Sequence, residues 1–275
     1  MPRSRRGSLI LRVAAVGNGK VRNVALMVGA LWLTACAYLQ KPKDPIPSLT
    51  IAAKVPAQRL FVVLPGRGDS LRTLVNTGIA ATIQRHLPDA DVLLVGATLT
   101  YYLDGKLVER LHDQIMRPAR ARGYREIWLL GASLGGMGAT LYEREHPDEA
   151  AGLVLLAPYM GEAPLIEEIA RAGGVAAWNS GTKPTELNRD NARREQWRVV
   201  QSWATDKQRA ADVWLVCGDT DRFHDAAELI APVLPPDHYF VPHGGHKWVV
   251  WKEGAEQALA AIAARTFPGV DRSIR

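Results

Sequence analysis

A serine flanked by glycines lies where an apolar run gives way to a helical pattern. The pentapeptide Gly131–Gly135, Gly-Ala-Ser-Leu-Gly, follows apolar residues 127–130 and precedes a helix-like stretch that opens at Gly136. A sharp strand-to-helix turn of this kind holds its serine in a strained backbone conformation and exposes the hydroxyl at the sheet edge. Glycines are needed beside the serine because side chains there would collide. The pattern predicts a strand, a tight turn and a helix, with Ser133 as a nucleophile.

Apolar strands alternate with helical patterns through most of the chain. We expect strands at 59–64, 91–95, 126–130, 152–157, 212–217 and 238–241. Helices are expected at 106–121, 136–146, 225–233 and 249–265. Strands and helices in this order form α/β folds with a mostly parallel sheet covered on both faces. With 47% hydrophobic residues, the 275-residue chain can bury a substantial core in one domain.

Two aspartates follow the strand predicted at 212–217. The strand leads into Gly218, and the next loop carries Asp219 and Asp221. A serine nucleophile needs a base and an acid that orients the base, and after a turn of the type described the acid precedes the base in the chain. We predict Asp221 as the acid, with Asp219 as the alternative. Without the upstream serine, either carboxylate would be interpreted as part of a solvated turn.

Two histidines lie in the loop after the last predicted strand. His243 and His246 flank Gly244 and Gly245, and both are candidates for the base. We prefer His246, because the two glycines give the loop the freedom to turn this imidazole toward the serine. Imidazoles titrate near neutral pH and can therefore accept a proton and return it to a leaving group. No catalytic role is expected for the remaining histidines, which are His86, His112, His146, His224 and His238.

A glycine-rich loop follows the first predicted strand. Residues 65–70 read Pro-Gly-Arg-Gly-Asp-Ser, directly after the apolar run 60–64. A tetrahedral intermediate needs hydrogen-bond donors for its oxyanion, and one of them is the amide that follows the nucleophile. We predict the backbone N–H groups of Arg67 and Leu134 as the two donors. Taken alone, the loop would be interpreted equally well as an ordinary turn.

These motifs resemble those of the α/β-hydrolase superfamily over most of residues 59–265. The loop 65–70 is similar to the oxyanion loop of carboxylesterases and acyl-protein thioesterases, with Pro65 where those enzymes usually carry histidine. The segment 244–248, Gly-Gly-His-Lys-Trp, is similar to the Gly-Gly-His-Asp-Trp segment of the esterase D group. In this chain Lys247 replaces the aspartate.

The wider pattern, with Tyr-Tyr at 101–102 and Arg-Leu-His at 110–112, resembles proteobacterial α/β hydrolases with esterase- and thioesterase-like motifs. This wider resemblance implies no particular substrate. Taken together, the motifs predict a serine hydrolase that cleaves a small-molecule carboxylic ester or thioester through an acyl-enzyme on Ser133. Two alternatives stay open: an acyltransferase with the same residues, and a non-catalytic envelope lipoprotein that uses the fold as a binding scaffold. No cofactor or metal is expected, because no metal-ligand spacing or phosphate-binding glycine motif is found.

The connection 158–211 is too long for a simple crossover between strands. Its apolar pattern predicts a small helical cap, with helices near 163–172 and 191–204. The resemblance implies that an insertion here lies over the active site. The cap carries three tryptophans, which are Trp178, Trp197 and Trp203. They either line an acyl pocket or hold the cap to the core.

The N-terminal segment has the pattern of a signal peptide. Residues 1–35 contain six Lys or Arg and no Asp or Glu, and an apolar run at 24–33 leads into Leu-Thr-Ala-Cys at 33–36. This ending resembles a bacterial lipobox and predicts cleavage, a lipidated Cys36 and an anchor in the outer membrane facing the periplasm. Cleavage would leave 28 basic and 28 acidic residues, so the net charge of +6 does not indicate nucleic-acid binding.

The predicted organisation places a tether and a domain behind the signal peptide. Residues 36–58 are interpreted as the lipidated N-terminus and an extended tether, 59–265 as the hydrolase domain and 266–275 as a C-terminal tail. Alternatively, the charge-free stretch 23–40 is an uncleaved membrane anchor. With the first of the two cysteines lipidated, Cys217 lacks a disulfide partner and is expected to be a buried thiol.

Overall fold

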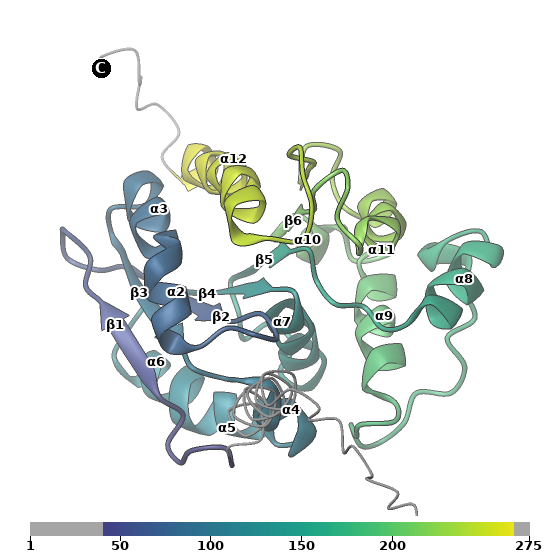
Figure 1. Cartoon of the computed structure of the whole chain (residues 1–275), viewed down its shortest axis with the longest axis horizontal. Helices are drawn as coiled ribbons and strands as arrows, with labels where there is room; N and C mark the ends of the chain where they lie inside the picture. Colours follow the sequence, from purple (N-terminus) through teal and green to yellow (C-terminus); the bar gives the residue numbers. More distant parts are fainter. Residues whose placement is uncertain (1–40, 267–275) are drawn as a thin grey trace, which may run out of the picture. The chain divides into compact units, whose positions relative to one another are not determined.

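The computed structural model describes residues 41–266, which are built on a seven-stranded sheet (Figure 1). The strands are β1 Ser48–Ile51, β2 Arg59–Leu64, β3 Ala90–Val95, β4 Glu126–Ala132, β5 Gly152–Leu156, β6 Val213–Val216 and β7 Tyr239–Phe240. Their order in the sheet is β1-β3-β2-β4-β5-β6-β7. β1 pairs antiparallel with β3, and the other neighbouring pairs are parallel.

Helices cover both faces of this sheet (Figure 1). They are α2 Leu71–Thr77, α3 Ile79–His86, α4 Leu99–Leu103, α5 Leu107–Leu111, α6 Arg117–Ala121, α7 Leu134–Glu145, α8 Ala163–Arg171, α9 Ala192–Ser202, α10 Lys207–Ala210, α11 His224–Ile230 and α12 Trp248–Thr266. One π-helical and two 3₁₀ segments complete the set in the described residues: η1 His112–Met116, η2 Val175–Ala177 and η3 Ala231–Val233. α3 and α12 pack together on one face, and α7 packs against β2, β4 and β5 on the other.

The central strands are apolar after their first residues because both faces of the sheet are covered. β2, β5 and β6 are buried at every residue, and β4 is buried from its second residue onward. Parallel sheets of this kind select continuous apolar runs instead of alternating ones. The predicted fold class, a mostly parallel sheet with helices on both faces as in α/β hydrolases, is confirmed.

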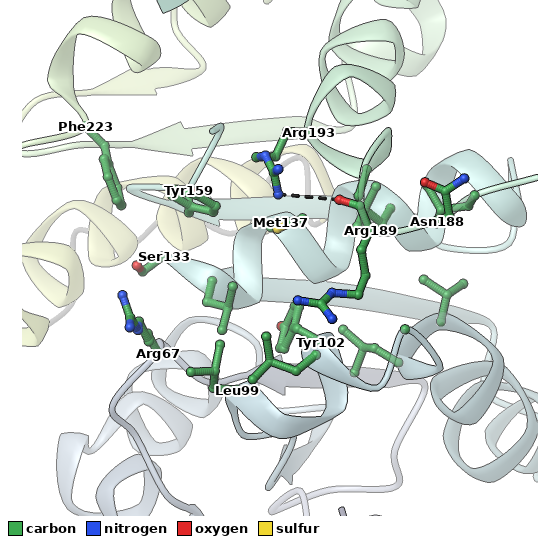
Figure 2. Close-up of a pocket in the computed structure, with 18 of the residues that line it drawn as sticks. Arg67, Leu99, Tyr102, Ser133, Met137, Tyr159, Asn188, Arg189, Arg193 and Phe223 are labelled. Atoms are coloured by element: carbon green, nitrogen blue, oxygen red, sulfur yellow. Dashed lines mark hydrogen bonds between the residues drawn. The ribbon is translucent and has the colours of Figure 1, made fainter. Parts of the chain in front are cut away.

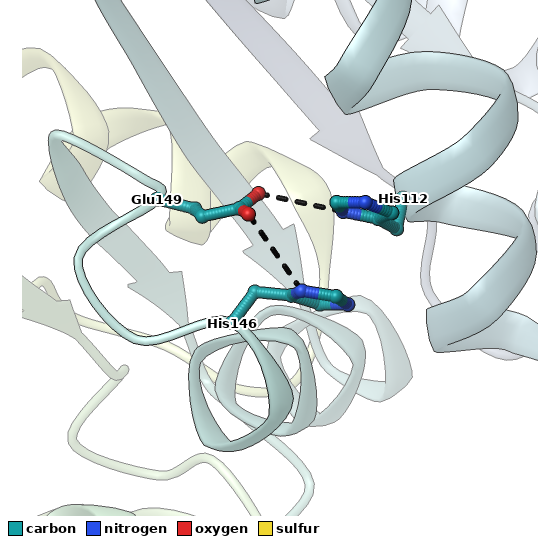
Figure 3. Close-up of side chains that lie close together, drawn as sticks. All are labelled: His112, His146 and Glu149. Carbon is teal, nitrogen blue, oxygen red and sulfur yellow. Dashed lines mark ion pairs between the residues drawn. The ribbon is translucent and has the colours of Figure 1, made fainter.

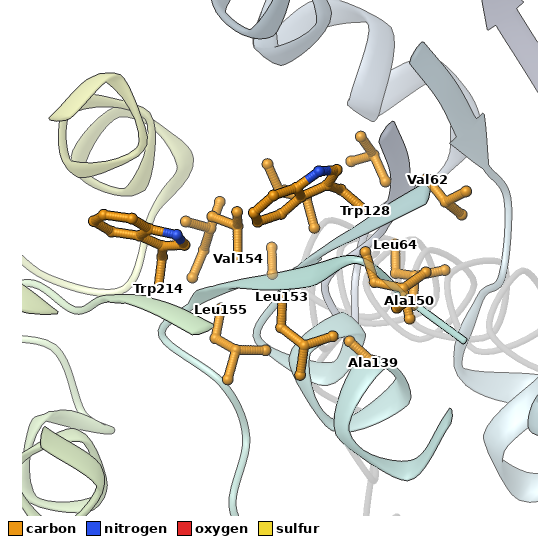
Figure 4. Close-up of a cluster of buried hydrophobic side chains, with 14 of the residues drawn as sticks. Val62, Leu64, Trp128, Ala139, Ala150, Leu153, Val154, Leu155 and Trp214 are labelled. Atoms are coloured by element: carbon orange, nitrogen blue, oxygen red, sulfur yellow. The ribbon is translucent and has the colours of Figure 1, made fainter. Parts of the chain in front are cut away.

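Successive side chains of β5 point to opposite faces, Leu153 and Leu155 to one and Val154 to the other (Figure 4). Trp128 and Trp214 lie on the face that carries α12, whereas Leu153 points toward α7. Trp128 stands opposite Gly152 in the sheet register, and a Cβ added to Gly152 would lie 2.2 Å from Cζ3 of the indole. The large ring is therefore accommodated only because its partner has no side chain.

The sheet begins earlier in the chain than the sequence predicts. β1 lies within the predicted tether 36–58, and the preceding Ile46 is buried with its N–H donating to Gln114 Oε1 at 2.8 Å. The tether interpretation of 36–58 is corrected, because the chain joins the domain before residue 59. Three prolines lie at 42–47, just before this strand, and an edge strand of four residues carries too short an apolar pattern to be recognised.

Short helices were also missed, and several boundaries shift. The predicted helix 106–121 consists of α5, η1 and α6, and the strands expected at 212–217 and 238–241 shorten to β6 and β7. The sequence patterns did not predict α2, α3 and α4. The apolar spacing of α2 is a weaker signal than the capping residues at its start. The Ser70 hydroxyl accepts a hydrogen bond from the N–H of Thr73 at the start of α2.

The connection 158–211 contains α8, η2, α9 and α10, and α9 packs against α7. Its tryptophans are buried inside this segment. Trp197 Nε1 donates to the carbonyl of Met160 at 2.7 Å, and Trp178 Nε1 donates to Glu168 at 2.8 Å. The contacts fit the second interpretation of these tryptophans, in which they hold the cap together and to the core.

No helix within residues 41–266 is both long and apolar enough to cross a membrane. The predicted signal peptide, Cys36 and the tail 267–275 lie outside the described residues.

Candidate active site

Ser133 occupies the turn between β4 and α7. Its φ of 51° and ψ of −111° place it in the left-handed half of backbone space, the strain expected from the sequence. The glycines on either side make this turn possible. A Cβ on Gly131 would lie 2.3 Å from the Gly135 carbonyl oxygen, and one on Gly135 would lie 2.4 Å from the carbonyl oxygen of Leu64. Close approach of α7 to β2 therefore fixes the position of the serine.

Three of the predicted residues form a continuous hydrogen-bonded chain. Ser133 Oγ lies 2.9 Å from His246 Nε2, and His246 Nδ1 lies 2.8 and 2.9 Å from Asp221 Oδ1 and Oδ2. With the carboxylate ionised, Nδ1–H donates to Asp221 and Nε2 is left to accept the serine proton. The structure thus brings together residues that lie up to 113 positions apart in the chain.

Asp221 is buried and held by several donors. The backbone N–H of Phe223 donates to Oδ1 at 2.9 Å, and Trp251 Nε1 donates to Oδ2 at 3.1 Å. Burial alone would raise the pKa of the Asp221 carboxyl, but hydrogen bonds from His246, Phe223 and Trp251 outweigh it and lower the pKa. The carboxylate is therefore ionised at neutral pH and keeps the imidazole oriented.

The alternative pair forms a separate contact at the surface. Asp219 Oδ2 lies 2.8 Å from His243 Nδ1, and its Oδ1 accepts from the N–H of Gly244 at 2.8 Å. The His243 side chain is 90% exposed. This pair fastens the base of the loop that carries His246, and neither member is hydrogen-bonded to Ser133 among the described contacts.

The predicted oxyanion donors lie on both sides of the serine. The N–H of Leu134 opens α7, and the loop of Arg67 runs past the nucleophile, since a Cβ added to Gly66 would lie 3.7 Å from Ser133 Cβ. Neither amide has a protein acceptor within residues 41–266. Free amides at a helix N-terminus favour negative charge. The arrangement suits stabilisation of an oxyanion.

A positioning network links this loop to the histidine loop and was missed in the sequence. Asp69 Oδ2 accepts from the N–H of Gly66 at 3.0 Å and from Trp248 Nε1 at 2.8 Å. Trp248 packs edge-on against Trp251, which in turn donates to Asp221. Asp69 stands in the glycine-rich loop, but its indole partner is 179 positions away, so no local signal identifies its role.

We expect Asp69→Ala to lower kcat by roughly 10- to 100-fold with little change in KM. Without the carboxylate the Gly66 turn loses its internal acceptor, and displacement of the neighbouring amide by about 1 Å is enough for a loss of this size. Steady-state kinetics on one activated ester measure the effect. Asp104→Ala, on the surface after α4, is the matched control; equal losses in both variants would contradict the positioning role.

Comparison with known proteins places this geometry in a family. The sequence profile described as serine aminopeptidase, S33 (Hydrolase_4) matches residues 105–267, more than half of the chain. The chain belongs to this family of α/β hydrolases. No curated protein sequence matches it.

Solved structures share the fold of this hydrolase at low sequence identity. A ferulic acid esterase is 19% identical with a TM-score of 0.53, over 80% of this chain and 92% of that one. The fluorophosphonate-binding serine hydrolase F of Staphylococcus aureus is 15% identical with a TM-score of 0.54, over 81% and 95%. The S-formylglutathione hydrolase of the same organism is 14% identical with a TM-score of 0.50, over 76% and 82%. These similarities support the fold. The resemblance to proteobacterial α/β hydrolases, noted in the sequence, stays a prediction.

A cavity of about 450 Å³ opens beside Ser133 in this hydrolase (Figure 2). It lies between α4, α5 and α7 on one side and residues 187–193 of the cap on the other. Much of its wall is aliphatic, including Leu99, Leu103, Leu107, Val108, Met137 and Leu141. None of the cap tryptophans lines it, so the acyl-pocket interpretation of those residues is wrong.

A second cluster of titratable groups lies away from Ser133 (Figure 3). His112 and His146 stack with ring centroids 4.0 Å apart and 3° between their planes, and their ligand atoms lie within 4.8 Å of a Glu149 oxygen. The sequence spacing did not reveal this group. Parallel rings do not direct their in-plane lone pairs at one ion, and Glu149 already accepts from Tyr142 at 2.6 Å and lies 3.7 Å from Arg120. The geometry suits a hydrogen-bonded tie between η1 and α7 better than a metal site.

Proposed function

We propose that this hydrolase cleaves a small-molecule carboxylic ester or thioester through an acyl-enzyme on Ser133. The observation that carries the proposal is the hydrogen-bonded chain from Ser133 through His246 to buried Asp221. A serine hydroxyl is a weak nucleophile unless a positioned base takes its proton. The apolar cavity beside Ser133 supports an acyl group as the part of the substrate that is bound.

In the first half of the reaction, Ser133 Oγ attacks the carbonyl carbon while His246 Nε2 takes the hydroxyl proton. The carbonyl oxygen becomes an oxyanion and accepts hydrogen bonds from the N–H groups of Arg67 and Leu134. Asp221 stabilises the imidazolium without itself being protonated. Collapse of the tetrahedral intermediate breaks the bond to the alcohol or thiol, which leaves with the proton from His246.

In the second half, water replaces the leaving group. His246 removes a proton from water as it attacks the acyl carbon. When the second tetrahedral intermediate collapses, the bond from the acyl carbon to Ser133 Oγ breaks and His246 returns the proton to that oxygen, which releases a carboxylic acid and free Ser133. An alcohol in the place of water would give a new ester by the same steps. Hydrolysis and acyl transfer therefore differ only in the acceptor that reaches the acyl-enzyme.

The test is to capture the acyl-enzyme and follow its fate. Mixing the full chain with a 4-nitrophenyl ester should release a burst of nitrophenol equal to the enzyme concentration, followed by slower turnover. Quenched samples should show the acyl mass on the peptide that contains Ser133. Added alcohols distinguish the acceptor, because new ester would show acyl transfer. A folded protein with neither burst nor adduct would instead support the binding-scaffold alternative.

We also propose that the hydrolase is attached to a bacterial envelope membrane through a lipid on Cys36, in the outer membrane facing the periplasm. The support is the basic, then apolar N-terminal sequence that ends in Leu-Thr-Ala-Cys at 33–36. No role for nucleic acid follows from the charge, because its excess lies in residues 1–35.

A further inference from the structure

The cavity beside Ser133 contains a buried hydroxyl without a protein partner. Tyr102, on α4, lines the cavity, and its hydroxyl oxygen is buried and accepts or donates no hydrogen bond within the described residues. It lies against α7, where a Cβ added to Gly138 would be 2.7 Å away. Burial raises the pKa of Tyr102, so the group is a neutral donor. Buried polar groups are almost always paired, so an unpaired one needs an explanation. Of the five such side-chain atoms in the described residues, the Tyr102 hydroxyl is the one whose residue lines this cavity, and a ligand atom would explain it.

The same cavity carries positive charge that acids compensate only in part. Four arginines line it, namely Arg67, Arg189, Arg193 and Arg222, and no Asp or Glu within residues 41–266 does. Arg193 is paired with Glu162 at 3.0 Å. The other three guanidinium groups have no carboxylate partner in the described part of the chain; Arg222 instead lies over the ring of Phe223, 4.9 Å from its centroid. A wall of this kind favours an anionic ligand.

Guanidinium groups lie at two places along the cavity. In Figure 2, Arg67 lies close to Ser133, whereas the Arg189 guanidinium lies in the part of the cavity that contains Tyr102. Aliphatic side chains such as Leu99 line the wall of the same cavity. A substrate bonded at Ser133 would therefore run along apolar surface before it meets a guanidinium and a phenol.

We propose that the acyl group of the substrate is apolar along its length and ends in a carboxylate, which binds Arg189 and the Tyr102 hydroxyl. A guanidinium pairs with a planar carboxylate through two parallel hydrogen bonds, and the phenol supplies a further donor. The inference rests on the proposed function, because it assigns the substrate class of that site. The substrates are half-esters or half-thioesters of dicarboxylic acids.

Matched substrates test this on the full chain. The 4-nitrophenyl half-ester of adipic acid and 4-nitrophenyl hexanoate have acyl chains of equal length and differ in the terminal carboxylate. After subtraction of the enzyme-free rate, we expect kcat/KM to be at least about tenfold higher for the half-ester. Longer dicarboxylic homologues define the best length. Equal or faster hydrolysis of the neutral ester at every length would overturn the inference while leaving the proposed function intact.

Two variants assign the preference to its residues. Arg189→Met should reduce the ratio of the two kcat/KM values to near one, and Tyr102→Phe, which removes only the buried oxygen, should reduce it several-fold. Arg72→Met is the matched control, since Arg72 is exposed on α2 and does not line the cavity. A preference that survives in Arg189→Met, or is lost equally in Arg72→Met, would contradict the assignment.

A binding measurement tests the carboxylate subsite separately from the proposed hydrolysis at Ser133. Calorimetric titration of Ser133→Ala with monomethyl adipate and with methyl hexanoate compares the two ligands without turnover. Tighter binding of monomethyl adipate, abolished by adding Arg189→Met, supports the carboxylate subsite even if no ester is hydrolysed. Equal binding of the two ligands would overturn it.

Discussion

Ser133→Ala is expected to lower kcat/KM for ester hydrolysis by about 10⁴- to 10⁶-fold. The substitution removes the oxygen atom that attacks the carbonyl and leaves the hydrogen bonds between His246 and Asp221 in place. Some rate above the uncatalysed reaction should persist, because the oxyanion amides and the cavity still bind the substrate. The measurement combines hydrolysis of a 4-nitrophenyl ester with labelling by a fluorophosphonate, which reacts with an activated serine whatever the natural substrate.

Ser202→Ala is the matched control for this experiment. The Ser202 hydroxyl donates to the carbonyl of Val199 within α9, and Ser202 does not line the cavity beside Ser133. Ser202→Ala should be labelled and should hydrolyse ester like the native chain, whereas Ser133→Ala should not be labelled and should keep only its residual rate, at an unchanged melting temperature. Labelling that persists in folded Ser133→Ala would show that the nucleophile has been assigned to the wrong residue.

Asp221→Asn is expected to lower kcat by about 10⁴-fold. The amide has nearly the same shape but no charge, and its NH₂ group would face His246 Nδ1. That contact favours the tautomer in which Nε2 carries the proton, so the ring can no longer accept one from Ser133. The loss should appear in kcat measured between pH 6 and 9, with the fold checked by thermal unfolding.

Asp219→Asn provides the comparison within the same loop. Asp219 is bonded to His243 and to the Gly244 amide at the surface, so its replacement should change kcat no more than a few-fold. The two aspartates were left as alternatives by the sequence, and the pair of variants separates them directly. Loss of activity in Asp219→Asn with full activity in Asp221→Asn would reverse the assignment.

Local sequence patterns predicted Ser133, His246 and Asp221, the three residues of the hydrogen-bonded series. Ser133 was recognised from its glycines and its place between strand and helix, and the order of Asp221 and His246 followed from the order expected after a turn of this type. The choice of His246 over His243 used the flexibility of two glycines, and the structure agrees because His246, and not His243, lies 2.9 Å from Ser133 Oγ. The strands were found for a similar reason, since buried parallel strands are continuous apolar runs.

Features that depend on distant contacts were not predicted. Asp69 accepts a hydrogen bond from Trp248, and neither residue type carries a local signal for that pairing. β1 was read as part of a tether because an edge strand has only one neighbour and a short pattern. The cap tryptophans were candidates for the cavity, but buried contacts within the cap and to the core hold them away from it.

The sequence by itself determined the fold class, the candidate nucleophile and the order of its candidate partners, because periodic burial and tight turns are properties of neighbouring residues. Only the tertiary structure decided which aspartate holds His246, which loop residue fixes the oxyanion amides and which side chains line the cavity. It also placed Tyr102 and Arg189 in that cavity, from separate segments of the chain. These outcomes follow from the packing of α4, α7 and the cap, and packing between distant segments has no period in the sequence.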